Sequence, residues 1–288
     1  MNKNNLEFQV EEEIILYDFL RKKITNKSKN NIKSMLANNC VTVDDKIRTK
    51  YDYKLKKGNI VKIKERQIKS DKFNDYIDII YEDKNIIVIN KPTGLLSIST
   101  KKEKEKTAYS MVMEYLRHNH EKVFVVHRLD RDTSGILLFA KNNHTKNMLQ
   151  DNWNNIVRIR GYIAIVEGVT KEKGTIKSYL KESKSTKVYS TNKKDGVEAI
   201  THYKKIKSNN NYSLLNVNID TGRKNQIRVQ MNDIGHGVVG DKKYGIKSDP
   251  LKRLGLHANI LEYEDPITKK IMHFETPIPQ KFKTIVKL

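Results

Sequence analysis

Nine consecutive residues in the middle of the chain hold an unusual density of chemically active side chains. The segment from His127 to Gly135 reads HRLDRDTSG and contains two carboxylates, two guanidinium groups, an imidazole and two hydroxyls. Apolar runs flank it, from Val123 to Val126 and from Ile136 to Ala140, and short runs of this kind are typical of buried strands. Because sites are commonly built from polar residues held by rigid elements, we expect a functional loop here.

The same residues also fit a solvated turn. The stretch from Asp130 to Asp132 would then face water, Gly135 would supply a positive φ, and the two hydroxyl side chains would cap backbone groups. Residue types and spacing alone leave both interpretations open.

The net charge of the chain indicates a polyanionic partner. The 288 residues include 56 Lys and Arg against 34 Asp and Glu, a formal charge of +22. A protein this basic attracts nucleic acid. A lysine-rich composition, visible together with many Asn and Ile residues, is the alternative source of part of the excess.

Cysteine and histidine usage argues against disulfides and metal centres. The single cysteine, Cys40, cannot form an internal disulfide, which fits a reducing compartment. The histidines lack the paired spacing with cysteine that a zinc site needs, so we expect no metal and no cofactor. The polar first residues hold no apolar stretch long enough for a signal peptide or a membrane span. We expect a cytoplasmic protein, and we expect it to be a monomer.

The first 64 residues are predicted to form a small α+β domain. Leu16, Phe19, Leu20 and Ile24 recur at helical spacing, a second short helix begins near Ile32, and two strands follow within CVTVDDK and KGNIVKIKE. This stretch resembles the S4 RNA-binding domain, which has a short helix pair, an extended V-x-V turn and a closing K-x-G-D-x-V strand. The resemblance implies that RNA is anchored by Arg21, Lys27, Lys29 and Lys33.

Two departures from the S4 pattern are present. Asp44-Asp45 stands where the family has Asn-Gly, and Lys29 stands where it has Arg. A generic α+β module with a solvated basic face is the alternative. Residues 65–75 are polar and are predicted to form a linker.

The central segment is similar to the signature of an enzyme family. HRLDRDTSG resembles the HRLD-x-x-TSG motif of the RluA-type pseudouridine synthases (RluA, RluC and RluD), in which the first aspartate is catalytic. This role falls on Asp130. The resemblance extends over nearly the whole chain and implies that residues 76–288 form an α+β catalytic domain with a mostly antiparallel mixed sheet.

Tyr162 lies in RIRGYIAIVEG, whose apolar pattern predicts a strand. Taken alone, a strand tyrosine is more often a core residue than a catalytic one. The family has a K-x-Y-x-A strand whose tyrosine packs on the target uracil, and here the motif reads R-G-Y-I-A. The resemblance therefore implies that Tyr162 contacts the substrate, with Arg160 in place of the lysine.

Arg228 lies in TGRKNQIRVQM, where a turn at Gly222 is followed by helical spacing. Taken alone, its spacing fits a surface arginine of a helix as well as a functional one. The segment resembles the family motif G-R-T-H-Q-I-R-V-H-L, whose second arginine pairs with the catalytic aspartate. A bidentate Arg228–Asp130 pair would keep the carboxylate charged and aimed.

The same resemblance implies a set of substrate contacts. Lys224, Asn225 and Gln230 replace Thr, His and His of the motif, and these departures put some of the contacts in doubt. The residues implied to bind substrate are His127, Arg128, Arg131, Thr133, Arg223, Asn225, Gln226, Ile227 and Leu256.

A glycine pattern later in the chain is not expected to bind a dinucleotide. Gly235 to Gly240 spells G-x-G-x-x-G, but that fingerprint must follow a strand and open a helix. Here it follows a helical segment and runs into GDKKYG, a loop similar to one in the synthase family.

Among the other predicted elements is a helix from Thr107 to His118, with Tyr115 on its inward face.

The resemblance implies isomerisation of uridine to pseudouridine in RNA, with Asp130 attacking C6 of the base or C1′ of the ribose of a flipped uridine. Large-subunit ribosomal RNA is favoured over tRNA as substrate, because relatives with an S4 domain tend to act there. The alternative is a catalytically silent RNA-binding or RNA-folding protein that uses the same surface.

Overall fold

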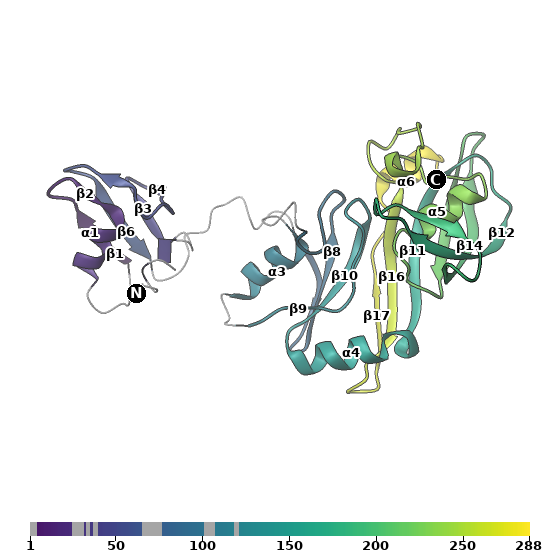
Figure 1. Ribbon diagram of the computed structural model, residues 1–288, viewed down its shortest axis with the longest axis horizontal. Helices are drawn as coiled ribbons and strands as arrows, with labels where there is room; N and C mark the ends of the chain where they lie inside the picture. Colours follow the sequence, from purple (N-terminus) through teal and green to yellow (C-terminus); the bar gives the residue numbers. More distant parts are fainter. Residues whose placement is uncertain are drawn as a thin grey trace. The chain divides into compact units, whose positions relative to one another are not determined.

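The computed structural model describes residues 5–24, 32, 35–36, 40–64, 77–100, 107–117 and 121–288. The chain divides into two compact units, residues 1–75 and residues 76–288, whose elements are labelled in Figure 1. The predicted linker, residues 65–75, lies outside the described residues. No helix in the described part of the chain is long and apolar enough to cross a membrane.

In the first unit, helix α1 (Leu16–Lys23) packs with short antiparallel strands. The strands β1 (Asn5–Gln9), β6 (Ile60–Lys64), β3 (Val41–Val43) and β4 (Lys46–Ile47) form one sheet in that order, and β2 (Ile14–Ile15) pairs with β5 (Lys54–Leu55). Leu16, Phe19 and Leu20 are buried as their spacing predicts, and Ile32 and Leu36 are helical and buried. The α+β pattern is observed, strand β1 was not predicted, and the S4-like identity stays a prediction.

The β3–β4 hairpin turns through Asp44 and Asp45, where the S4 pattern has Asn-Gly. Both residues have a positive φ, 49° and 61°, as a two-residue type I′ turn requires. The Asp44 carboxylate also accepts hydrogen bonds from the Ile60 amide at 2.9 Å and from Asn59 Nδ2 at 2.7 Å. The departure from Asn-Gly is therefore compatible with the tight turn.

Within the described residues, the second unit contains an 11-stranded sheet. Its main order is β13 (Val188–Thr191), β12 (Lys173–Glu182), β14 (Val197–Ser208), β15 (Tyr212–Ile219), β11 (Val157–Glu167), β16 (Leu256–Glu264), β10 (Ser134–Ala140), β8 (Ile86–Lys91) and β7 (Asp78–Glu82). In addition, β9 (Phe124–Val125) pairs with β10, and β17 (Ile271–Glu275) pairs with β16. Only the β10–β16 pair is parallel among the described ladders. The predicted mostly antiparallel mixed sheet is confirmed.

Strand β10 is buried along its whole length and carries a helix on each face. Leu138 clusters with Leu149 of α4 (Asn143–Ile156), whereas Leu137 clusters with Val112 of α3 (Ala108–Arg117). Successive strand residues point to opposite faces, so a strand covered on both faces has a continuous apolar sequence. The loop with the HRLDRDTSG motif thus ends on a strand that is buried and packed on both faces.

The remaining helices cover the other half of the sheet (Figure 1). Helix α5 (Gln226–Asp233) packs on β12, β13 and β14, and α6 (Gln280–Ile285) packs on β15. A short 3-10 helix, η1 (Lys242–Tyr244), lies in the GDKKYG loop. The inward orientation predicted for Tyr115 of α3 is wrong: its side chain is exposed, and its hydroxyl donates to Glu82 Oε2 at 3.0 Å.

Candidate active site

One cavity of the second unit, of about 860 Å³, brings the predicted site residues together. It lies around the end of the loop between β9 and β10 and the N-terminus of α5. All three predicted catalytic residues and all nine predicted substrate-binding residues line it: Asp130, Tyr162, Arg228, His127, Arg128, Arg131, Thr133, Arg223, Asn225, Gln226, Ile227 and Leu256. Residues more than 120 positions apart in the sequence therefore meet at one site.

The backbone on both sides of Asp130 is held by side chains from the β8 end of the sheet. The buried Lys91 Nζ donates to the Arg131 carbonyl at 3.0 Å. Ser97 Oγ donates to the Leu129 carbonyl at 2.8 Å and accepts from the Leu129 amide at 3.0 Å. Because the residues before and after Asp130 are fixed, its carboxylate is presented from a defined backbone.

Strand β10 is joined to β16 directly after the loop. Ser134 Oγ lies 2.7 Å from Nδ1 of the buried His257, and Arg253 Nη2 donates to the same hydroxyl at 2.6 Å. Burial lowers the pKa of His257 to about 4, so the ring is neutral and can accept from Ser134. Gly135 has a φ of +113°, and a Cβ there would lie 2.0 Å from the Ala258 carbonyl oxygen. Only glycine allows the two strands to approach this closely.

Arg228 reaches Asp130 by one contact and a different carboxylate by two. Its Nη1 lies 3.4 Å from Asp130 Oδ2, whereas Nε and Nη2 donate to Asp241 Oδ2 and Oδ1 at 2.7 Å each. The predicted contact between Arg228 and Asp130 is present, but its predicted bidentate form is wrong. The fork of the guanidinium group is occupied by Asp241, which lies in the GDKKYG loop.

The N-terminus of α5 places Asn225 against Arg228. Asn225 adopts the left-handed conformation with a φ of 53° and directly precedes the helix. Its Oδ1 accepts from Arg228 Nη1 at 3.2 Å, and its Nδ2 donates to the Tyr244 hydroxyl at 3.0 Å. The Tyr244 ring lies 5.4 Å from the Arg228 guanidinium carbon. These contacts hold the arginine in one orientation.

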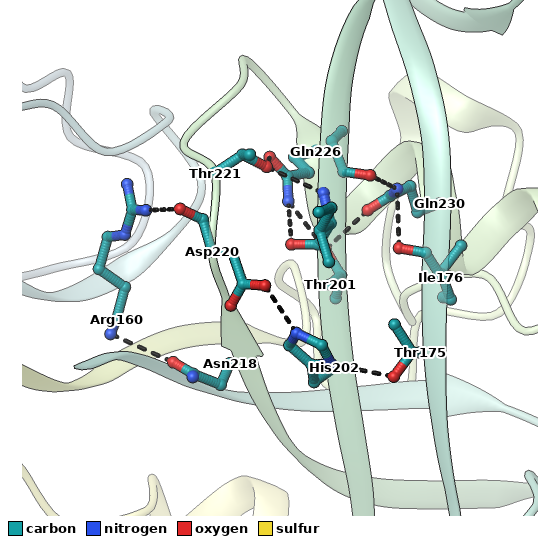
Figure 2. A network of polar contacts seen from close by, with 12 residues as sticks. Arg160, Thr175, Ile176, Thr201, His202, Asn218, Asp220, Thr221, Gln226 and Gln230 are labelled. Atoms are coloured by element: carbon teal, nitrogen blue, oxygen red, sulfur yellow. Dashed lines mark hydrogen bonds and ion pairs between the residues drawn. The ribbon is translucent and has the colours of Figure 1, made fainter. Parts of the chain in front are cut away.

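Two buried amides of α5 anchor the helix to the sheet (Figure 2). Gln230 Nε2 donates to the Ala199 carbonyl at 2.9 Å, and its Oε1 accepts from Thr201 Oγ1 at 2.6 Å. Gln230, which replaces the family's histidine, is fully buried and uses its amide for hydrogen bonds within the protein.

Gln226 makes a similar set of hydrogen bonds. Its Oε1 accepts from Thr221 Oγ1 and the Arg223 amide, and its Nε2 donates to the Ile200 carbonyl and Thr201 Oγ1. Its side-chain donors and acceptors are used within the protein, and its substrate-binding role stays a prediction.

Tyr162 lies on β11 at a register shift against β16 between Gly161 and Tyr162. A bulge of this kind redirects a side chain and is common beside active sites. The half-buried ring contacts the clusters that contain Ile227 and Leu129. Burial raises the pKa of Tyr162 to about 12, and the Asp130 carboxylate adds to this rise. The phenol is therefore protonated at neutral pH.

His127 has a structural environment. Burial lowers its pKa to about 4, its Nε2 accepts from the Leu138 amide at 3.1 Å, and its ring stacks on Trp153 with centroids 5.0 Å apart. A neutral, stacked imidazole supports the start of the loop. It is not available as a cationic substrate contact.

Exposed cationic side chains surround the cavity. Arg131 Nε donates to the Gly94 carbonyl, and Arg223 Nε donates to the Glu198 carbonyl, both at 3.1 Å. Arg128 and Lys224 are exposed nearby. In the first unit Arg21 is exposed on α1, while Lys27, Lys29 and Lys33 lie outside the described residues.

The Gly235 to Gly240 segment follows α5 and ends at η1, with Val238 bridged to Val166 of β11. It does not connect a strand to an α-helix, as a dinucleotide fingerprint would.

Two site residues were missed by sequence reasoning. Asp241 stands in the quoted GDKKYG stretch, and Lys91 stands in residues 90–94, which read NKPTG, but neither stretch indicated the partner of the side chain. Both are buried charges, which are rarely found without a specific partner.

Comparison with known proteins agrees with this geometry. Residues 85–233 match the family model of RNA pseudouridylate synthase. The chain is 35% identical over 216 residues to the uncharacterized RNA pseudouridine synthase YhcT of Bacillus subtilis, covering 73% of this chain and 72% of the relative. It is 28% identical over 279 residues to ribosomal large subunit pseudouridine synthase D of Haemophilus ducreyi, covering 90% of this chain and 86% of the relative.

A solved structure shares the fold. Human RNA pseudouridylate synthase domain containing 4 superposes with a TM-score of 0.61 at 21% identity, covering 73% of this chain and 93% of that chain. The chain belongs to the RNA pseudouridylate synthase family and is of the RluA/RluD type. It is a pseudouridine synthase, an isomerase that acts on uridine in RNA.

Proposed function

We propose that Asp130 is the nucleophile of this synthase and that Arg228 orients it. The observation that carries the proposal is the 3.4 Å contact between Arg228 Nη1 and Asp130 Oδ2, in a cavity that also exposes Tyr162. A carboxylate beside a guanidinium group stays ionised in a partly dry pocket, and it can attack an electrophilic carbon.

The proposed reaction breaks the N1–C1′ glycosidic bond and forms a C5–C1′ bond. Asp130 adds to C1′ of the ribose or to C6 of the base and leaves again after the base has turned. The proton lost from C5 is balanced by a proton taken up at N1. No electrons are gained or lost overall, so the step does not require a redox cofactor.

The target uridine must leave the RNA stack to reach Asp130, at a cost of roughly a few kcal/mol. Tyr162 is the side chain placed to stack on the base, because its ring lines the cavity and its phenol is uncharged. Base–aromatic stacking offsets part of the cost. Arg128, Arg131 and Arg223 at the cavity are suited to phosphate contacts.

We further propose that the substrate is large-subunit ribosomal RNA and that residues 1–64 serve as an S4-like anchor on it. Relatives named ribosomal large subunit pseudouridine synthase D support the first point. The exposed Arg21 on α1 supports the second. We expect a monomer to suffice, since the twelve predicted residues of the cavity come from one chain.

Mapping of pseudouridine in cells with and without the gene tests this function. We expect one or a few sites in large-subunit ribosomal RNA to disappear without the gene. They should return with the wild-type gene but not with the Asp130→Asn gene. Restoration by Asp130→Asn would contradict the nucleophile, and loss of sites only in tRNA would contradict the substrate.

A further inference from the structure

We infer that Asp241 is a positioning residue. It accepts hydrogen bonds from Nε and Nη2 of Arg228, the fork of the guanidinium group, and thereby leaves Asp130 with a single, long contact. This inference rests on the proposed role of Asp130 and deepens it. It gives the GDKKYG loop a part in the reaction. The proposed reaction steps do not involve this loop, and Asp241 is not among the described residues that line the cavity.

The donors of Arg228 are divided unequally among its neighbours. Nε and Nη2 each donate to an Asp241 oxygen at 2.7 Å, which is the geometry of a charge-assisted bidentate pair. Nη1 is shared between Asn225 Oδ1 at 3.2 Å and Asp130 Oδ2 at 3.4 Å. Asp130 therefore has the longest of the contacts that Arg228 makes to its three side-chain acceptors.

Burial strengthens the same preference. The side chains of Asp241 and Arg228 are 1% and 6% exposed, whereas that of Asp130 is 29% exposed. A charge pair shielded from water is held more strongly than one that water can screen. Arg228 is thus neutralised mainly by Asp241, and the three groups together keep one negative charge beside the substrate.

This division suits a nucleophile. A carboxylate clamped through both oxygens would have fewer free lone pairs and a stabilised ground state, and interactions that favour the ground state do not accelerate a reaction. One donor is enough to aim Asp130, while the other oxygen remains free to attack. Without Asp241, we expect the Arg228 guanidinium group to form a bidentate pair with Asp130 instead.

The turn that carries Asp241 is built for this placement. Asp241 precedes η1, and its side chain accepts from the Tyr244 amide. Tyr244 in turn covers the Arg228 guanidinium group with its ring. The same short loop therefore supplies both the anion and the aromatic cover of the arginine.

An NMR measurement on the full-length protein tests the pairing without an activity assay. The Arg228 Nε–H resonance, assigned by its loss in Arg228→Lys, should exchange slowly with solvent in the wild type and equally slowly in Asp130→Asn. If the slow exchange is lost in Asp130→Asn, Asp130 holds the fork and the inference is overturned.

The kinetic test uses Asp241→Asn, with Asp249→Asn as the matched control. Asp249 pairs with Lys242 on the same loop at 3.5 Å and makes no contact with Arg228 among the described interactions. We expect kcat of Asp241→Asn to fall about 10- to 100-fold, as for other partners of a functional side chain, with KM for RNA within a few fold. Asp241→Glu, which restores the charge, should recover part of the loss.

Two kinetic outcomes would overturn the inference. One is a wild-type kcat in Asp241→Asn, and the other is an equal fall of kcat in Asp249→Asn.

The outcomes also separate this inference from the proposed function. If Asp130→Asn keeps full activity, the nucleophile assignment fails whatever the NMR result is. If Asp241→Asn does not fold, the exchange of Arg228 Nε–H in Asp130→Asn still decides which carboxylate holds the fork.

Discussion

The Nζ atom of Lys91, in strand β8, lies 3.0 Å from the carbonyl oxygen of Arg131, the residue that follows Asp130. The same ammonium group donates to the carbonyls of Pro92 at 3.0 Å and Leu95 at 2.7 Å. Its three protons are thus matched to three carbonyl oxygens. The side chain is fully buried, so this single amino group, when protonated, fixes the loop of the candidate nucleophile to the edge of the core.

Lys91→Met should lower kcat by roughly 10²-fold, because three carbonyls lose their donor and a displacement of about 1 Å at the reacting group has an effect of this size. RNA affinity should change by no more than a few fold. Lys84→Met is the control, since Lys84 is exposed in the preceding turn. Equal kcat for the two variants would show that Lys91 does not position the loop.

The difference in stability between the wild type and Lys91→Met should depend on pH. Burial lowers the pKa of Lys91 from 10.5 to about 7, so between these values the unfolded chain binds more protons than the folded one. The contribution of Lys91 to the free energy of unfolding therefore rises as the pH rises above about 7. Below pH 7 the full destabilisation from burying the charged Lys91 is present. As the pH rises, the free energy of unfolding of the wild type should increase relative to that of Lys91→Met by at most about 1.4 kcal/mol per pH unit. Urea unfolding at pH 7, 8 and 9 measures this, and a flat difference would contradict it.

Substitutions of Tyr162 separate stacking from proton transfer. If stacking is its main role, Tyr162→Phe should bind and flip the uridine nearly normally, and Tyr162→Ala should lose about 1 to 3 kcal/mol. A 2-aminopurine next to the target reports flipping, and product formation reports the later steps. Normal flipping by Phe with a stalled product would assign proton transfer to the hydroxyl. Wild-type activity of the Ala variant would remove Tyr162 from the site.

Gly135→Ala should destabilise the second unit by roughly 2 to 6 kcal/mol, the sum of backbone strain and overpacking. The new Cβ would meet the Ala258 carbonyl oxygen at 2.0 Å, in a residue with a φ of +113°. Gly94→Ala is the matched control, because Gly94 has a φ of +80° and a Cβ added there would have no neighbouring atom within 4 Å. That variant should lose only about 1 to 2 kcal/mol. Similar losses of unfolding free energy for Gly135→Ala and Gly94→Ala, measured by chemical denaturation, would show that β10 and β16 leave room for a side chain at residue 135.

Much of the fold and site could be predicted from local sequence. The apolar runs around HRLDRDTSG predicted the strands that border the loop, and the motifs predicted that Asp130, Tyr162 and Arg228 would meet. Strand β1 could not be predicted, because NLEFQ has only two apolar side chains. Its place is set by pairing with β6, more than 50 residues later.

The orientation of Tyr115 and the contact between Asp241 and Arg228 could not be predicted, for the same physical reason. Tyr115 has the helical spacing of a core residue, but Val112 and Leu116 already fill that face, and Glu82 accepts its hydroxyl. Asp241 lies 13 residues after Arg228 on an irregular loop, where no periodicity indicates which way a side chain points. Tertiary contacts decide both cases.

Deleting residues 1–75 should leave a folded and active enzyme with weaker RNA binding. The described residues that line the cavity all belong to the second unit. Residues 1–75 contain 18 Lys and Arg against 11 Asp and Glu, +7 of the total +22. Each lost phosphate contact should reduce the salt slope of log affinity by roughly 0.7 to 0.9. Unchanged affinity and slope would show that the segment does not anchor RNA, and loss of turnover in a folded protein would show that it helps to build the site.

The most direct test of the account is the rate at which Asp130→Asn releases tritium from RNA that carries C5-tritiated uridine, at saturating enzyme. Asp132→Asn is the matched control, as an exposed acid two residues away on the same loop. The account predicts that Asp130→Asn loses roughly 10³-fold or more in rate while RNA affinity stays within a few fold. Asp132→Asn should remain close to the wild type. Tritium release by Asp130→Asn at the wild-type rate would contradict the assignment of Asp130 as the nucleophile.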